Sequence, residues 1–146
     1  MIRPMKLADL DAVMEIELDL FPKEAWSKDM FLEELAEVPQ SREVVVLEQS
    51  DQIIGYASLR FVGREGDINT IAIARGHQRQ GLGKKLLNWL EETAVSHGVR
   101  ELFLDVRTDN EPAIDLYKGA GFVRIDIRRN YYGPSIDADV MRKKLA

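Results

Sequence analysis

The chain has 146 residues, of which 45% are hydrophobic and 31% are charged, as expected of one soluble domain spanning residues 1–146. Its net charge of −5 argues against a general nucleic-acid binder, and its lack of cysteine excludes disulfides, thiolate metal sites and an acyl-cysteine intermediate. No stretch approaches the roughly 20 apolar residues that span a bilayer, and no signal-peptide pattern is present, so we expect a cytoplasmic protein.

The first half of the chain is predicted to form strands and two helices. Expected are a short edge strand at 2–4, helices at 7–20 and 28–37, and strands at 42–49, 53–62 and 67–74. In the first helix, Leu10, Val13 and Met14 share one face, and Glu17 falls where that apolar stripe would continue. Ser27 is a predicted N-cap for the second helix.

The second half predicts alternating strands and helices. Expected are a glycine-containing basic loop at 76–83, a helix to about His97, a strand at 102–106, a helix at 111–120 and strands at 122–129 and 137–144. Asn110 is a predicted N-cap, with Pro112 in the first turn that follows. The resulting order, β-α-α-β-β-β-α-β-α-β-β, predicts an α/β protein whose mixed sheet carries helices on its faces.

The loop at 78–84 has the features of a phosphate cradle. Gly81 and Gly83 allow a tight bend and a close approach to a ligand, and the helix that follows presents unpaired N–H groups and its positive dipole end. The alternative is an ordinary strand-to-helix turn whose basic residues face solvent. The dinucleotide fingerprint fails because Leu86 stands where glycine is required, and the Walker pattern fails because Lys85 follows Lys84.

At this loop the sequence resembles a known family. Residues 78–83, QRQGLG, are similar to the Q/R-x-x-G-x-G/A motif of the GCN5-related N-acetyltransferases (GNAT). Residues 102–107, Asn110, 113–117 and 121–122 resemble the later half of that family's CoA site. Residues 25–27 and 128–132 resemble the RimI-like branch, the ribosomal-protein-alanine N-acetyltransferases.

The resemblance implies a GNAT fold, with a mostly antiparallel mixed sheet and about four helices. It implies acetyl-CoA as co-substrate and no metal. The cofactor-binding residues carried over are Ile71, Ala72 and Ile73 along pantetheine, Arg79, Gln80, Gly81, Leu82, Gly83 and Lys84 at the phosphates, and Asn110 and Tyr117.

Acetyl transfer needs a neutral amine and a stabilised leaving thiolate. The resemblance places the base at Asp105, where the RimI-like branch has Glu, so the shorter side chain acts directly or through a water. The other interpretation is a strand-end Asp that accepts hydrogen bonds from backbone or Arg107. Glu17 is a second candidate for the acceptor amine, or else a surface Glu. Tyr117 matches the tyrosine near the CoA sulfur; its alternative is a core aromatic.

The acceptor side has further candidates. Trp26 is predicted to wall the acceptor groove or to enter the core. Tyr131 and Tyr132 are predicted to wall the groove or to form an exposed hairpin pair.

Three functions remain open on the sequence. The first is acetylation of a protein N-terminal α-amine, with a ribosomal protein as the implied acceptor. The second is acetylation of lysine or of a small amine, and the third is a non-catalytic acyl-CoA-binding module. An α-amine titrates about 2.5 pH units below lysine, so it is easier to deprotonate by about 3.4 kcal/mol. We expect a peptide acceptor, no direct nucleic acid, no membrane, and a monomer or weak dimer.

Overall fold

The structure, a computed structural model, describes residues 1–145. Its seven strands form one sheet in the order β1-β2-β3-β4-β5-β7-β6, and only the β4–β5 pair is parallel. The strands are β1 (Ile2–Pro4), β2 (Arg42–Gln49), β3 (Gln52–Val62), β4 (Glu65–Ile73), β5 (Glu101–Arg107), β6 (Val123–Gly133) and β7 (Ile136–Lys144). The helices are α1 (Leu10–Leu20), α2 (Lys28–Ala36), α3 (Leu82–Ser96) and α4 (Glu111–Gly119), with 3-10 turns η1 (Leu7–Asp9) and η2 (Arg75–His77). The predicted element order and mixed sheet are confirmed.

Differences from the predicted boundaries have local causes. The first helix starts as η1, because the Asp9 carboxylate accepts hydrogen bonds from Arg3 and from the Lys6 N–H, which holds this turn tight. The last hairpin is longer than predicted. Irregular pairing between Arg128 and Gly133 carries β6 on to Gly133, where the sequence indicated an end at residue 129.

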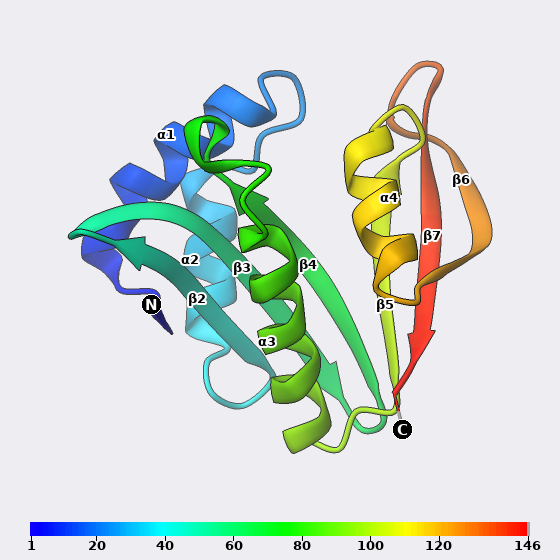
Figure 1. Ribbon diagram of the computed structural model, residues 1–146, viewed down its shortest axis with the longest axis horizontal. Coiled ribbons are helices and arrows are strands. Elements are labelled where there is room, and N and C mark those ends of the chain that lie inside the picture. Colours follow the sequence, from blue (N-terminus) through cyan, green and yellow to red (C-terminus); the bar gives the residue numbers. More distant parts are fainter. Residues whose placement is uncertain (146) are drawn as a thin grey trace.

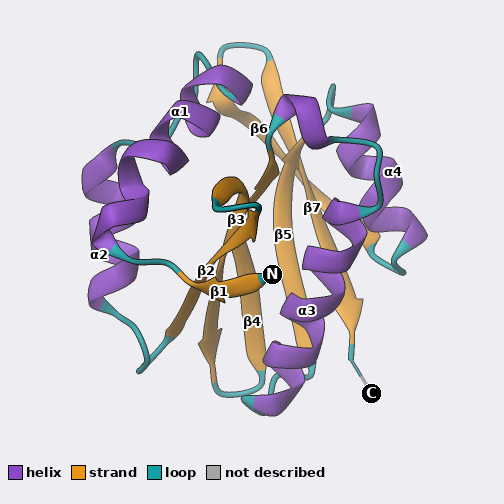
Figure 2. Cartoon of the chain, turned by 60° about the vertical axis from the view of Figure 1, so that its left-hand side comes forward, coloured by secondary structure: helices purple, strands orange, loops and turns teal. Residues whose placement is uncertain are grey.

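The helices cover both faces of the sheet. Figures 1 and 2 show α1 and α2 on one face and α3 and α4 on the other. Leu86, Leu87 and Leu90 of α3 are fully buried against the sheet, and Phe31 of α2 is buried with Tyr56 of β3 on the opposite face. Burial of each such side chain contributes roughly 1.5–3 kcal/mol.

The middle of the sheet splays. β4 pairs with β5 only from Glu65 to Ile68, although β4 continues to Ile73. Its register with β3 shifts at the same point, since Ser58 pairs with Thr70 but the next β3 residue pairs with Ile68, so Asn69 is bulged out. A bulge bends a strand and raises its twist. β4 and β5 therefore diverge beyond Ile68, as Figure 1 shows.

Both predicted helix N-caps are confirmed. Ser27 Oγ accepts a hydrogen bond from the Met30 N–H at 3.2 Å, and Asn110 Oδ1 accepts one from the Ala113 N–H at 3.3 Å. Within residues 1–145, no helix combines the length and the apolar character needed to cross a membrane.

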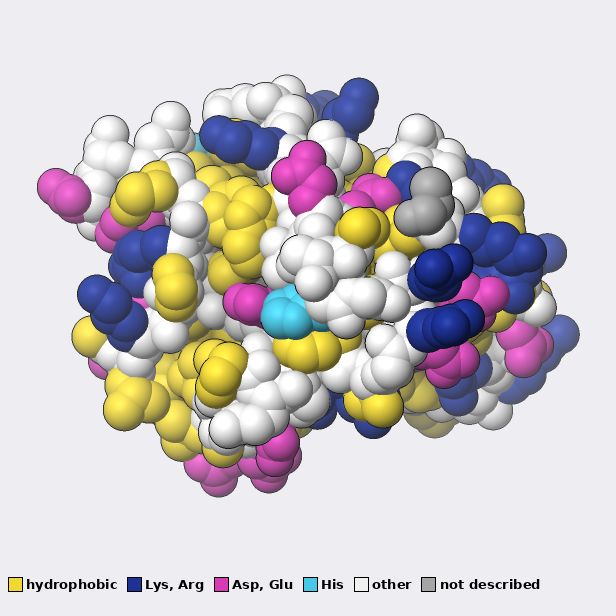
Figure 3. Space-filling view, turned by 90° about the horizontal axis from the view of Figure 1, so that it is seen from below, with side chains coloured by type: hydrophobic (Ala, Val, Ile, Leu, Met, Phe, Trp, Pro, Cys, Tyr) yellow, Lys and Arg dark blue, Asp and Glu magenta, His cyan; other side chains and the backbone are white. Residues whose placement is uncertain are grey.

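Charge is distributed unevenly over the molecule. In Figure 3, Lys and Arg side chains gather on the right-hand side, where β6 and β7 lie. These two strands carry Arg124, Arg128, Arg129, Arg142, Lys143 and Lys144. The excess of acidic groups in the whole chain therefore lies outside this hairpin.

Candidate active site

Two cavities open where β4 and β5 diverge. The first, called here the loop groove, is lined by Leu20, Phe21, Ile71, Ala72, Ile73, Gln78, Arg79, Gly81, Gly83, Lys84, Asn110, Pro112, Ala113, Leu116 and Tyr117. The second, the carboxylate cleft, is lined by Glu17, Phe21, Glu24, Trp26, Ile68, Asn69, Thr70, Ile71, Leu104, Asp105, Val106, Arg107, Asn110, Ala113, Tyr117 and Tyr132. The two share Phe21, Ile71, Asn110, Ala113 and Tyr117, so they adjoin in the gap of the sheet.

The loop groove is built mainly from backbone. Arg79 and Gly81 have left-handed φ angles of 63° and 78°, which turn the loop tightly into α3. The intrahelical bond from the Lys85 N–H to the Gly81 carbonyl, at 3.1 Å, marks the first turn. The N–H groups before it point out of the helix start, and the dipole favours an anion there. The groove is thus suited to phosphate.

Two side-chain features shape this groove. Gln78 Nε2 donates to the Ile73 carbonyl at 3.0 Å, which fastens the loop to the end of β4. At Gly83 an added Cβ would lie 3.3 Å from Leu116 Cδ2 of α4, a tight contact that would require this side chain to shift. A ligand can therefore lie against bare backbone at this position.

Most of the predicted cofactor residues come together. Gln80 and Leu82 are the exceptions, because neither lines the groove: Gln80 is exposed, and Leu82 packs against the core. Gln78 was absent from the predicted set, although it is the first residue of the motif that identified the loop.

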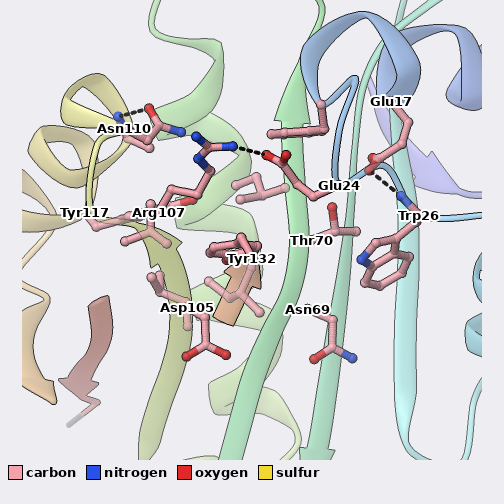
Figure 4. Close-up of a pocket in the computed structure, with 16 residues that line it drawn as sticks. Glu17, Glu24, Trp26, Asn69, Thr70, Asp105, Arg107, Asn110, Tyr117 and Tyr132 are labelled. Atoms are coloured by element: carbon pink, nitrogen blue, oxygen red, sulfur yellow. Dashed lines mark hydrogen bonds and ion pairs between the residues drawn. The ribbon is translucent and has the colours of Figure 1, made fainter. Parts of the chain in front are cut away.

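Glu17 is the most buried carboxylate of the cleft, with 2% of its surface exposed. Its Oε1 accepts from the Tyr56 hydroxyl at 2.5 Å and its Oε2 from the Trp26 N–H at 2.9 Å (Figure 4 shows the second bond). Burial raises the pKa of Glu17, and it outweighs the opposite effect of these hydrogen bonds. The interpretation of Glu17 as a surface residue is wrong, and its place on the apolar stripe of α1 is explained.

Asp105 lies at the start of the divergence on β5. Its carboxylate forms an ion pair with Arg128 Nε of β6 at 3.3 Å, and 30% of the side chain is exposed. Arg107, the partner that the sequence suggested, instead bonds to Glu24 at 2.9 Å and to Asp109 at 2.8 Å. Asp105 therefore has an exposed carboxylate edge in the cleft.

Tyr117 borders both cavities from α4. It is 7% exposed and packs edge-on against Phe122 with 6.0 Å between ring centroids. Burial raises the pKa of its phenol. Among residues 1–145, none forms a hydrogen bond with its hydroxyl, which leaves that group free to meet a ligand in the gap.

The predicted aromatic wall is only partly assembled. Trp26 lines the cleft and also packs on Phe31, with ring centroids 5.0 Å apart, so its position is compatible with both interpretations. Tyr132 lines the cleft, and its pKa is raised by burial and by the nearby negative charge of Asp105. Tyr131 is 51% exposed and lies outside the lining, in edge contact with Tyr132.

Sequence reasoning missed several lining residues. Glu24 lies in the loop between α1 and α2, where the sequence has no hydrophobic periodicity that would place its side chain. Its ion-pair partner, Arg107, is 83 positions away in sequence. The sequence predicts ordinary strand residues at Asn69 and Thr70, since a bulge leaves no clear mark in sequence. Among residues 1–145, no cluster of three His, Asp or Glu could hold a metal ion.

Comparison with known proteins agrees with this geometry. The family model described as "Acetyltransferase (GNAT) family" matches residues 10–122. The N-alpha-acetyltransferase RimI of Mycobacterium tuberculosis is 36% identical over 142 residues, which cover 93% of this chain and 87% of that protein. The ribosomal protein bS18-alanine N-acetyltransferase of Escherichia coli is 36% identical over 138 residues, covering 93% and 88%.

A solved structure is similarly close. The crystal structure of the ribosomal-protein-S18-alanine N-acetyltransferase from Escherichia coli matches with a TM-score of 0.86 and 31% identity, over 100% of this chain and 94% of that one. Sequence, fold and the two joined cavities lead to one assignment: the chain belongs to the GNAT family and is an N-acetyltransferase, a family of enzymes that use acetyl-CoA.

Proposed function

We propose that this enzyme acetylates the N-terminal α-amine of a protein by direct attack of the amine on acetyl-CoA in a ternary complex. The observation that carries the proposal is the junction of the two cavities, which share Ile71 and Tyr117, so that a ligand in one cavity can reach a ligand in the other. Two relatives are named for N-alpha-acetylation or for the alanine of ribosomal protein bS18, which supports a ribosomal protein as the acceptor.

The loop groove fits the co-substrate. Its α3 N-terminus and the cations Arg79 and Lys84 suit a pyrophosphate, and the end of β4, Ile71 to Ile73, offers an extended wall for the pantetheine arm. Acetyl-CoA supplies the activated acetyl group. The protein's own task is to orient the thioester and to manage protons.

Asp105 is the better placed of the two candidate bases. Both oxygens of Glu17 already accept hydrogen bonds, whereas Asp105 has one partner at 3.3 Å and an exposed edge. As the amine nitrogen bonds to the acetyl carbon, it loses a proton, which Asp105 accepts directly or through a water. Glu17, whose pKa is raised by burial, attracts the cationic chain end when it is ionised.

Tyr117 acts on the leaving group. The C–S bond breaks as the new amide forms, and the thiolate needs stabilisation. Because burial raises the pKa of Tyr117, its phenol stays protonated at neutral pH. A phenol with an ordinary pKa near 10 protonates a thiolate with a pKa near 8.5 only uphill, so a hydrogen bond to sulfur is its main contribution.

The cleft favours a chain end over a lysine within a chain. The Arg107–Glu24 ion pair ties the α1–α2 loop to β5 on one side, and Trp26 and Tyr132 form part of the wall (Figure 4). The lower pKa of an α-amine also suits a base as modest as a carboxylate. The proposal includes residues 1–146 working as one domain, in the cytoplasm, on a protein or peptide.

The test is acetylation with mass-spectrometric mapping of the labelled site. The substrates are peptides with a free N-terminal Ala and an internal Lys, together with the same peptides blocked at the N-terminus. Label on the α-amine alone is expected. Label on lysine, or only on small amines, would overturn the acceptor class while keeping the reaction. No label with acetyl-CoA still bound would overturn the reaction in favour of a binding module.

A further inference from the structure

A buried carboxylate on α2 connects three strands of the sheet. Glu34 is 8% exposed and lies one turn after the fully buried Phe31, on the face that packs against the sheet. Its Oε1 accepts from Ser58 Oγ at 2.6 Å and from Asn69 Nδ2 at 2.8 Å, and its Oε2 accepts from Arg42 Nε at 2.9 Å. The three donors stand on β3, β4 and β2, respectively.

Such a network needs a reason, because a buried charge is costly unless it is fully paired. Burial acts to raise the pKa of Glu34, but the hydrogen bonds from Asn69, Ser58 and Arg42 outweigh it, and the pKa is lowered. The group is therefore an ionised acceptor at neutral pH. An apolar residue here would pack α2 without that cost, but it would leave the Asn69 amide unheld.

One of the donors is the bulged residue itself. Asn69 is the position of β4 that has no partner on β3, and it is also the first residue beyond the β4–β5 pairing, which ends at Ile68. Neither β3 nor β5 therefore holds Asn69 in place by strand pairing. Figure 4 shows Asn69 and Asp105 at the same level of the cleft, on opposite sides of the gap.

We propose that Glu34 is a positioning residue that, by holding the Asn69 side chain, fixes the β4 bulge and so the width of the gap in which amine and thioester meet. Its effect on turnover rests on the proposed function. Few contacts separate Glu34 from the reactants. Asn69 lines the cleft, and so do Thr70 and Ile71, which follow it directly on β4.

The test compares two variants that each remove one hydrogen bond from the same Glu34 oxygen. Asn69→Ala releases the bulge. Ser58→Ala is the matched control, because Ser58 has a pairing partner on β4, Thr70, and lines neither cavity. We expect similar losses of thermal stability. We expect kcat to fall on the order of tenfold to a hundredfold in Asn69→Ala, since small misplacements cost that much, with KM for acetyl-CoA and the kcat of Ser58→Ala little changed.

A third variant separates positioning from direct contact with the acceptor. In the double variant Glu34→Gln/Asn69→Asp, the amide donor stands at position 34 and the carboxylate acceptor at position 69. The hydrogen bond between α2 and the bulge is therefore kept, with its direction reversed. Recovery of most of the lost kcat is expected. Equal kcat in Asn69→Ala and Ser58→Ala would overturn the proposal, as would a folded double variant that stays as slow as Asn69→Ala.

Failure of the proposed function stays distinguishable from failure of this proposal. The kinetic comparison uses whichever amine the wild type acetylates. If the wild type acetylates no amine, the proposed function is wrong. Hydrogen exchange of the backbone amides of residues 69–71 then tests the positioning role of Glu34. Faster exchange in Asn69→Ala than in Ser58→Ala supports it, and equal exchange contradicts it.

Discussion

The loop groove and the carboxylate cleft adjoin, yet they are built in different ways. The groove comes largely from one continuous stretch, from Ile71 to Lys84, and it presents backbone N–H groups, glycines and a helix end. The cleft draws Glu17, Trp26 and Asp105 from separate elements and holds polar side chains by long-range hydrogen bonds and ion pairs. A binding site made of backbone groups is disrupted by a substitution that adds a side chain. A site made of side chains is disrupted by a substitution that removes a functional group.

The largest effect is expected from adding a side chain in the groove. Gly83→Glu places a Cβ 3.3 Å from Leu116 and a negative charge beside the phosphate site. Repulsion between two charges about 4 Å apart costs about 4 kcal/mol at an effective dielectric of 20, so acetyl-CoA should bind on the order of a thousandfold more weakly. Calorimetry measures this.

Gly76→Glu is the matched control, since a Cβ there meets nothing within 4 Å and Gly76 lies outside the groove lining. Equal affinity in both variants would remove the phosphate role from the loop.

In the cleft, removing the negative charge of Asp105 should lower kcat without changing the affinity for acetyl-CoA. General base catalysis contributes about 10²–10⁴-fold, so Asp105→Asn should lower kcat by at least about a hundredfold, with acetyl-CoA affinity unchanged. Stopped-time acetylation and calorimetry measure the two quantities. Asp126→Asn, an exposed carboxylate on β6, is the control. A kcat at the wild-type level would transfer the base role to Glu17.

Tyr117 lies on the boundary between the two cavities and so sharpens the comparison. Tyr117→Phe keeps the packing on Phe122 and removes only the hydroxyl. Loss of one hydrogen bond to a developing charge, worth about 1.5–3 kcal/mol, should lower kcat by roughly ten- to a hundredfold without weakening acetyl-CoA binding. Tyr131→Phe, on an exposed ring outside both linings, provides the baseline. Equal kcat in the two variants would exclude Tyr117 from stabilising the thiolate.

The same difference explains how far the sequence could predict the molecule. Element order, both N-caps and most of the groove follow from local signals: periodicity, glycine placement and a motif of six residues. A motif gives positions along the chain but not which side chains turn inward, so it does not show that the Gln80 side chain is exposed and that the Leu82 side chain packs against the core.

The cleft was harder to predict, because its order arises only on folding. Nothing adjacent to Asn69 in sequence shows that β4 bulges there, and Glu34 contacts it across 35 positions. Arg107 stands two residues from Asp105, yet it points to Glu24, 83 positions away, while Arg128 approaches Asp105 from β6. Pairings of this kind depend on the register between strands and on the path of a loop, which local patterns do not encode.

The smallest expected effect concerns stability and the buried carboxylate of the cleft. Because burial raises the pKa of Glu17, the folded protein binds its proton more tightly than the unfolded chain does. Its contribution is therefore fully present below the ordinary value of 4.5 and is lost as pH rises through the raised value. Glu17→Gln imitates the protonated side chain at every pH. The variant should match the wild type near pH 4 and exceed its melting temperature by a few degrees at pH 8.

Differential scanning calorimetry across that pH range measures the difference, and Glu15→Gln, an exposed neighbour on α1, controls for the loss of a charge. The other titrating groups are common to both proteins and cancel in the comparison. A difference in melting temperature that does not change between pH 4 and pH 8 would mean that Tyr56 and Trp26 fully offset the burial of Glu17. The buried carboxylate of the cleft would then not lower the free energy of unfolding. The two cavities would differ in how they are built but not in their effect on stability.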